Sequence, residues 1–418
     1  MTYLYNIIIK IYYFGIVITG LFNKKSRLWI YGRRNLFQKI KSSVKNDNKK
    51  IAWFHCASLG EFEQGRPIIE MFKQKYPEYK IVLTFFSPSG YEIRKNYKNA
   101  DYIFYLPLDT KDNATKFIEL IKPKIVFFIK YEFWFNYLNI LHKKNIPVFI
   151  VSAIFRPEQY FFKWYGLWFR KQLHNITHFF VQNAESKKLL NFVKINNVSV
   201  TGDTRFDRVW AIYKQKKLFP LIKLFKQDKN LFVAGSTWPK DEDLLSVLIN
   251  NNIYKNLKFL IAPHEINKEH INEIINKFKV KTLKLSEATQ DNINTANVLI
   301  IDSIGILSHL YQYATITYIG GGFGKGIHNI LEPANFENPI IFGPNYNKFQ
   351  EAKDLIKLKG AFCVTNSNKL IDKTKELLDD SNFLAQTSKI SKNYIENKKG
   401  ATENVFRSIK KQVKLLNG

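Results

Sequence analysis

A glycine-rich stretch between two apolar runs constrains the fold of this chain more than any other feature. Residues 315–319 are mostly β-branched, and residues 339–342 form a second apolar run. Five glycines fall within residues 320–326, where the backbone can adopt φ > 0 and let another group come close. A helix follows from about Asn329, with Pro333 in its first turn, where a missing N–H is tolerated. The pattern predicts strand, loop, helix and strand, which is a βαβ unit of a parallel sheet.

The start of that predicted helix is suited to an anionic ligand. Its unpaired N–H groups and the positive end of its dipole favour a phosphate. Glu332 lies where it can accept hydrogen bonds from ribose hydroxyls. The same glycines would also form a tight turn with no ligand, so the loop is informative only together with the residues at the helix start.

Apolar runs alternate with helical spacers along both halves of the chain. This rhythm is typical of parallel sheets with crossover helices, and it predicts an α/β fold with two domains. The remaining expected strands are residues 51–55, 81–86, 103–106, 125–129, 148–151 and 178–181 in the first half, and 231–234, 259–262 and 298–301 in the second.

The pattern also predicts where the domains begin and end. We expect residues 1–35 to be a membrane anchor with a basic flank, and residues 36–209 to be an N-terminal Rossmann-like domain. Residues 210–230 are basic and irregular, which indicates a linker. Residues 231–418 are expected to form the C-terminal Rossmann-like nucleotide-sugar domain, with a helical, basic tail.

The first residues suggest a membrane segment. Residues 4–22 are almost wholly apolar and approach the roughly 20 residues that span a bilayer. Lys24, Lys25 and Arg27 follow directly, and the positive-inside rule then places the downstream domain on the cytoplasmic side. Three interpretations are open: a single span, a helix lying in the membrane interface, and a buried helix of the first domain.

The formal charge of +29 favours anionic partners, namely nucleic acid, acidic lipid headgroups or phosphorylated sugars. Residues 155–171 interleave aromatic and basic side chains. Such a stretch can stack nucleic-acid bases, sit at a membrane interface, or form a core helix with a basic outer stripe. Beside the apolar N-terminus we favour an anionic inner-membrane surface and expect no nucleic acid. The two cysteines, Cys56 and Cys363, argue against a disulfide framework and a cysteine metal site.

Two glutamates follow predicted strands at the edge of the first sheet where ligands of parallel sheets bind. Glu61 comes after Gly60 at a strand-to-helix turn, and Glu132 follows the fourth strand. Two carboxylates on one cleft push each other's pKa values apart, which gives one of them a base-like value. The alternative for each is an N-cap or first-turn acid that only stabilises its helix.

Other strand-end loops carry residues that fit an anionic or nucleotide ligand. Arg205 can meet an anion or be a solvated turn residue. Ser236 and Thr237 can hold a phosphate oxygen or cap the next helix. His264 lies at the cleft edge or is structural, and residues 302–306 can line a nucleobase through backbone groups. The sequence has no metal-ligand spacing and no P-loop, so we expect backbone N–H groups, Lys and Arg to hold any phosphate.

Six motifs occur in order along the chain: residues 58–61 with 65–67, 132–136, 202–207, 234–237, 263–265 and 328–333. In this order they resemble the Kdo transferases of lipopolysaccharide assembly (3-deoxy-D-manno-octulosonic acid transferases), and the resemblance covers nearly the whole chain. It implies a GT-B-type fold with two Rossmann-like domains facing a cleft, a CMP-Kdo donor, a lipid A precursor as acceptor, and no metal or other cofactor.

The resemblance also implies roles for single residues. Glu61 matches the general base of the family, and the residues that match Glu132 and Arg205 are assigned to transition-state stabilisation. The CMP contacts fall on Pro263 and His264, on Ile304, Gly305 and Ile306, and on Asn329, Ile330, Leu331 and Glu332. The remaining substrate-binding candidates are Ser58, Gly60, Ser236, Thr237, Gly324, Lys325 and His328.

Three positions depart from the family pattern. Pro263 stands where many members have Arg, Ile327 replaces a Gly, and Arg205 replaces a Lys, which keeps the charge but not the geometry. The sequence therefore predicts an inverting Kdo transferase on the cytoplasmic face of the inner membrane. The alternatives are another nucleotide-sugar enzyme of the same fold, such as a hexosaminyl transferase or a UDP-sugar epimerase, and a basic nucleic-acid-binding protein.

Overall fold

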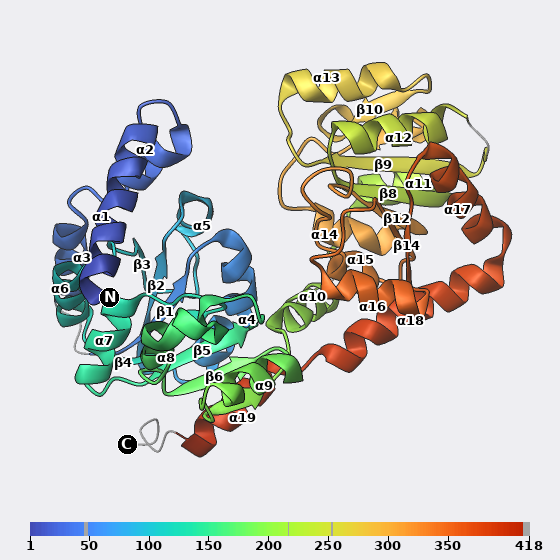
Figure 1. Ribbon diagram of the computed structural model, residues 1–418. Helices are drawn as coiled ribbons and strands as arrows, with labels where there is room; N and C mark the ends of the chain where they lie inside the picture. The colour runs from blue at the N-terminus through green and yellow to red at the C-terminus, as the bar shows by residue number, and fades with distance from the viewer. Residues whose placement is uncertain (46–48, 216, 252–253, 413–418) are drawn as a thin grey trace. The chain divides into compact units, whose positions relative to one another are not determined.

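The computed structural model describes residues 1–45, 49–215, 217–251 and 254–412 (Figure 1). The chain forms two compact units, Met1–Arg208 with Lys399–Gly418, and Val209–Lys398. Each unit has one seven-stranded sheet in which all paired strands are parallel. This confirms the predicted α/β fold with two domains.

The first sheet has the strand order β3-β2-β1-β4-β5-β6-β7. The sequences of its central strands are continuously apolar because helices cover both faces of the sheet. Helices α3, α6 and α7 cover one face, and α4 and α19 supply buried side chains to the other. The strands are β1 Lys50–Cys56, β2 Tyr79–Phe85, β3 Tyr102–Tyr105, β4 Pro123–Ile129, β5 Val148–Ala153, β6 His178–Val181 and β7 Val198–Val200. The α-helices are α1 Thr2–Thr19, α2 Lys24–Tyr31, α3 Leu36–Val44, α4 Leu59–Lys75, α5 Pro88–Arg94, α6 Lys111–Ile121, α7 Phe135–Lys143, α8 Leu167–Leu173, α9 Ala184–Phe192, α10 Thr204–Lys214 and α19 Ala401–Gln412.

The second sheet has the order β10-β11-β9-β8-β12-β13-β14. Helices α12, α13 and α17 pack on one face, around a core that includes Leu245, Ile274 and Leu370. The strands are β8 Asn230–Thr237, β9 Leu257–Pro263, β10 Thr282–Lys284, β11 Val298–Ile300, β12 Ile316–Ile319, β13 Ile340–Phe342 and β14 Ala361–Cys363. The α-helices are α11 Pro220–Lys226, α12 Pro239–Asn250, α13 Lys268–Lys277, α14 Leu307–Leu310, α15 Leu331–Asn335, α16 Gln350–Leu358, α17 Ser367–Asp379 and α18 Ser381–Lys398.

Two boundaries differ from those expected from the sequence. The segment 210–230 is largely helical, since α10 continues to Lys214 and α11 buries Ile222 and Phe225. The tail does not end in the second unit, because α19 belongs to the first. Val405, Phe406 and Ile409 lie on one side of that amphipathic helix and enter the first core beside α4.

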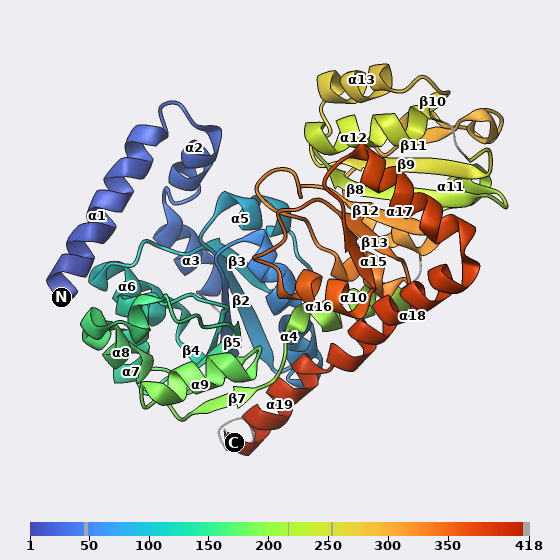
Figure 2. The same ribbon diagram turned by 45° about the vertical axis from the view of Figure 1, so that its right-hand side comes forward.

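Helix α1 lies against the first unit along one side only (Figures 1 and 2). The Tyr5 hydroxyl donates to Asp109 at 2.6 Å, and Asn136 Nδ2 donates to Asn6 Oδ1 at 2.9 Å. Further along the helix, the rings of Tyr12 and Phe86 stack with centroids 6.1 Å apart. Of the described helices, α1 alone has the length and hydropathy to cross a membrane, and 6% of its 18-residue window is buried. The interpretation of residues 4–22 as a buried helix is therefore wrong.

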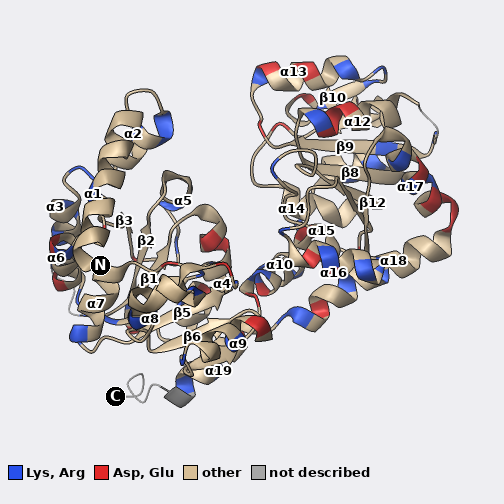
Figure 3. Ribbon diagram, in the orientation of Figure 1, with Lys and Arg blue, Asp and Glu red and all other residues tan. Residues whose placement is uncertain are grey.

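The outer side of α1 is mostly apolar, with Lys10 as the helix's single charged residue, and basic residues follow in α2 (Figure 3). The large apolar side chains exposed on α1 are Tyr3, Leu4, Ile7, Ile8, Ile11, Tyr12, Tyr13, Phe14, Val17 and Ile18. A second exposed apolar group lies within residues 155–171, where the Trp164 side chain is 90% exposed. The rest of that stretch is partly core, because Phe155 and Phe161 are buried.

Candidate active site

Glu61 lies in the first turn of α4, directly after strand β1. The helix begins at Leu59, so only two residues separate it from the end of β1 at Cys56. The Glu61 carboxyl group turns back toward the end of that strand. Glu61 Oε2 accepts the Ala57 N–H at 2.6 Å. Ser58 is the N-cap residue but makes no side-chain capping bond, and a Cβ on Gly60 would meet open space.

The environment of Glu61 makes it a stronger base than an ordinary carboxylate. Burial first, and then the charge of Glu132, raise the pKa of Glu61 to about 8, while the Ala57 N–H and Lys130 act in the opposite direction. The expectation that the two glutamates interact is confirmed, and Glu61 is the one with the raised pKa.

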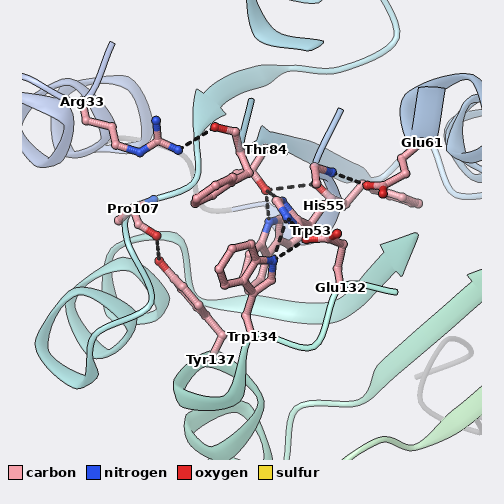
Figure 4. A network of polar contacts seen from close by, with 12 residues as sticks. Arg33, Trp53, His55, Glu61, Thr84, Pro107, Glu132, Trp134 and Tyr137 are labelled. Carbon is pink, nitrogen blue, oxygen red and sulfur yellow. Dashed lines mark hydrogen bonds and ion pairs between the residues drawn. The ribbon is translucent and has the colours of Figure 1, made fainter. Parts of the chain in front are cut away.

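Glu132 follows strand β4, where Lys130 has a φ of 73° and turns the chain. One carboxylate oxygen, Oε2, has two nitrogen neighbours: Trp134 Nε1 donates to it at 2.6 Å, and His55 Nε2 lies 3.3 Å away (Figure 4). His55 is fully buried at the end of β1, the strand that pairs with β4. The register of two parallel strands therefore brings His55 and Glu132 together across 77 residues of sequence.

Arg205 lies near the start of α10 and is engaged by Asp203. Its Nε donates to Asp203 Oδ2 at 2.7 Å, and its backbone N–H donates to Asp203 Oδ1 at 2.9 Å. The Arg205 side chain is one-third exposed. Arg205 is a helix residue paired with Asp203, so the interpretation as an exposed turn with a solvated charge is wrong, and its role toward an anion remains a prediction.

The second unit contains a cavity of about 590 Å³, within the range of small-molecule sites. Three predicted residues line it: Gly324, Lys325 and His328. The other lining residues are Trp238, Pro239, Lys240, Asp241, Gly321, Phe323 and Gly326.

Hydrogen bonds to the Asp241 side chain fix the conformation of the glycine loop. This buried carboxylate accepts the Gly321 N–H at 2.8 Å, the Trp238 N–H at 3.0 Å and the Tyr318 hydroxyl at 2.7 Å. Gly321 has a φ of +89°, and a Cβ on Gly320 would come within 2.3 Å of Ser236 O. The loop therefore needs glycine at both positions, and one of its N–H groups is already used by Asp241.

The helix after this loop offers fewer free N–H groups than the sequence predicts. Helix α15 begins at Leu331 and is five residues long. The Asn329 side chain accepts the Leu331 N–H at 3.1 Å and donates to Glu332 Oε1 at 3.0 Å. Ile330 and Leu331 are buried. The strand, loop, helix and strand order is confirmed, but the Asn329 side chain already occupies the N–H of Leu331, the first residue of the helix.

Three rings form a layer at the cavity wall. Trp238 Nε1 donates to His328 Nε2 at 3.0 Å, and His264 stacks on both rings with centroids 4.6 and 4.5 Å away. Burial and the neighbouring His264 lower the pKa of His328 to about 4. His328 is therefore neutral near neutral pH, and its proton lies on Nδ1. Pro263 ends β9 beside this layer.

Other predicted residues do not line this cavity. Thr237 is buried and its hydroxyl donates to Glu242 at 3.0 Å, so it is occupied within the fold. It does not cap α12, whose N-cap is Trp238. Ser236 has a φ of 55° at the end of β8. Ile304 is 87% exposed, and Gly305 and Ile306 follow it in the loop after β11.

Sequence reasoning missed His55, Trp134, Trp238 and Asp241. Trp134 stands inside the motif that carries Glu132, and His55 lies three residues before the motif that carries Glu61, so closeness to these motifs is the signal that could have found both. Asp241 reads as an ordinary first-turn acid, and its contact with the glycine loop spans 80 residues of sequence. Within the described ranges, no group of three or more His, Cys, Asp or Glu side chains is arranged to hold a metal ion.

Comparison with known proteins agrees with the fold and the site. Residues 32–208 match the family described as 3-deoxy-D-manno-octulosonic-acid transferase (kdotransferase). The chain is 28% identical to the 3-deoxy-D-manno-octulosonic acid transferase of Rickettsia bellii over 84% of each chain, and 28% identical to that of Haemophilus influenzae over 79% of each. The structure is similar to UDP-GlcNAc 2-epimerase from Neisseria meningitidis, with a TM-score of 0.61 and 18% identity over 87% of this chain and all of that one.

Two parallel α/β units, one with a largely buried carboxylate pair and one with a cavity of small-molecule size, form the GT-B fold. The family match over residues 32–208 and the relatives that cover most of the chain make it a glycosyltransferase. Within that class, the chain is similar to the Kdo transferase family.

Proposed function

We propose that this protein transfers Kdo from CMP-Kdo to a hydroxyl group of a lipid A precursor, with inversion at the anomeric carbon. Similarity to the Kdo transferase family supports the donor and the acceptor class. The observation that carries the mechanism is Glu61, a partly buried carboxylate whose pKa is raised to about 8 by desolvation and by Glu132.

The chemistry requires a base because a sugar hydroxyl is a poor nucleophile near neutral pH. Glu61 accepts the hydroxyl proton as that oxygen bonds to the anomeric carbon, and the bond from that carbon to the CMP phosphate oxygen breaks. A base with a pKa near the working pH is the most effective, and such assistance contributes ~10²–10⁴-fold to the rate. Lys325 and the neutral His328 line the cavity that we assign to the donor. In this proposal no metal ion takes part, so a chelator should leave transfer unchanged.

Changing Glu61 to Gln keeps the shape of the side chain and removes its basicity. We expect kcat for transfer to fall by about 10²–10⁴-fold, while the affinity for CMP changes little because the cavity belongs to the other unit. The measurement is transfer to a lipid A precursor under donor saturation, with CMP affinity measured separately.

The matched control for this change is Glu119→Gln, since Glu119 is an exposed glutamate on α6. Glu63 is not a clean control, because it binds both Arg94 and Arg208 at 2.8 Å. Near-normal turnover of the Glu61→Gln enzyme would assign the base to another group and contradict the mechanism.

The second prediction concerns the nucleotide. We expect CMP to bind more tightly than UMP or AMP in calorimetric titration, with a change in Trp238 fluorescence because that ring lines the cavity. A Lys325→Gln variant should weaken CMP binding, and Lys348→Gln is its control on the same unit. A preference for UMP would contradict the proposal and favour a UDP-sugar enzyme, the alternative to which the fold similarity points.

We further propose that the protein binds the cytoplasmic face of the inner membrane through the outer side of α1. A free span would have to release Tyr5 from Asp109 and Asn6 from Asn136, whereas a helix lying in the interface keeps both contacts. The exposed apolar side of α1 would enter the membrane, and the basic residues at the start of α2 would meet anionic headgroups.

Replacing Ile7, Ile11 and Phe14 together by Ser should release the protein from vesicles that contain anionic lipid, since each of these side chains is more than half exposed. Sedimentation at raised salt measures the release. Phe192→Ser, at an exposed apolar position on α9, is the control and should still pellet. If the triple variant still pellets and Trp164→Ser does not, the exposed tryptophan is the anchor and this assignment is wrong.

A further inference from the structure

Two nitrogen atoms, from Trp134 and His55, contact the Oε2 atom of Glu132. Trp134 Nε1 lies at 2.6 Å and His55 Nε2 at 3.3 Å, while the Glu132 side chain is only 12% exposed (Figure 4). An indole N–H can only donate. Because the Trp134–Glu132 contact is shorter than the 3.1 Å from Trp134 Nε1 to His55 Nε2, we assign the indole proton to Glu132.

The proton on His55 follows from the groups behind it. Trp53 Nε1 donates to Thr84 Oγ1 at 2.8 Å, so that hydroxyl must direct its own proton elsewhere. Its two acceptors are His55 Nδ1 at 2.9 Å and Phe54 O at 3.4 Å, and the shorter contact favours His55. His55 Nδ1 then accepts, and Nε2 carries the proton that points at Glu132. All of these side chains except Glu132 and Trp134 are fully buried, so water does not supply another partner.

The groups that face Glu61 complete the electrostatic environment of the pair. Glu61 accepts backbone N–H groups from Ala57 and Ser58, and the charges of Glu132 and Lys130 act on it. The Cys56 thiol is buried beside both glutamates, and Glu63 is bound by two arginines. Donors directed at one of two interacting carboxylates favour the charged form of that one, and the shared proton then resides on the other.

We propose that His55 and Trp134 are positioning residues that keep Glu132 ionised, so that Glu61 rather than Glu132 takes the proton of the acceptor hydroxyl. This inference rests on the proposed role of Glu61 as base and adds the residues that select it. The raised pKa of Glu61 agrees with it, since the charge of Glu132 is the second largest cause of that rise.

Removing one donor should redistribute the proton between the carboxylates. Trp134→Phe keeps a ring against Phe86, whose centroid lies 4.7 Å away, but removes the N–H. The Glu132 carboxylate then has one donor fewer, its charge acts less on Glu61, and the pKa of Glu61 falls. A hydrogen bond to a charged group corresponds to about one to two pH units at the group that loses it, and Glu61 responds only to the charge of Glu132, so we expect a downward shift of up to about one unit at Glu61.

The test is infrared titration of the Glu61 carboxyl band in the full-length protein, with the band identified by its loss in Glu61→Gln. The midpoint should move down, by up to about one pH unit, in Trp134→Phe and in His55→Leu. It should stay near the wild-type value in His55→Gln, whose amide can still donate. Tyr137→Phe is the matched control, because it removes a buried bond to Pro107 O at 3.1 Å without touching Glu132. Unchanged midpoints in Trp134→Phe and His55→Leu, or an equal shift in Tyr137→Phe, would overturn the proposal.

A second measurement separates this inference from the proposed function. The acid limb of the pH profile of kcat/KM for Kdo transfer should move by the same amount as the infrared midpoint, whereas a merely structural effect would lower the whole profile. If the wild-type enzyme transfers no Kdo but the midpoints shift as described, the proposed function fails and the positioning role stands. If transfer is normal and neither the limb nor the midpoints move, the positioning role fails alone.

Discussion

The structure of the first unit depends on one costly arrangement, two interacting carboxylates in a largely buried site at the ends of paired strands. Burial disfavours the charge of both, and their mutual repulsion disfavours it further. Hydrogen-bond partners offset part of this cost: backbone N–H groups bind Glu61, and His55 and Trp134 contact Glu132. Such a site lowers the stability of the fold and raises the basicity of one group, which is what a transferase that activates a sugar hydroxyl needs.

The surrounding fold makes this arrangement rigid. Strands β1 and β4 are neighbours at the centre of the first sheet, so their carboxyl ends are fixed by parallel hydrogen bonding on both sides. The second unit uses a carboxylate differently. Asp241 lines the cavity and binds the backbone of the glycine loop, which shapes the cavity wall. In the first unit Glu61 remains available to accept a proton, whereas in the second unit Asp241 stabilises the conformation of the glycine loop.

Much of this architecture could be predicted from the sequence. The long central strands were found because their apolar runs are continuous, and Glu61 and Glu132 were found because they follow such runs. The short strands β7, β10 and β14 were missed because their three residues are not a run of bulky apolar side chains, unlike those of the equally short β11 and β13. The partner of α19 and the contact between Asp241 and the glycine loop were missed for another reason. Both depend on residues far apart in sequence, and local periodicity carries no information about such contacts.

The central claim is that Glu61 keeps its proton in the folded protein up to a pKa of about 8, against an ordinary value of 4.5. Between these values the native state holds a proton that the unfolded state has lost, so the free energy of unfolding must decrease as pH rises. The direct test is the difference in that free energy between Glu61→Gln and the wild-type protein, measured by denaturant unfolding from about pH 5 to about pH 9. We predict that the difference shifts in favour of Glu61→Gln by up to a few kcal/mol over this range and levels off above about pH 8. A difference that does not change with pH would contradict the account.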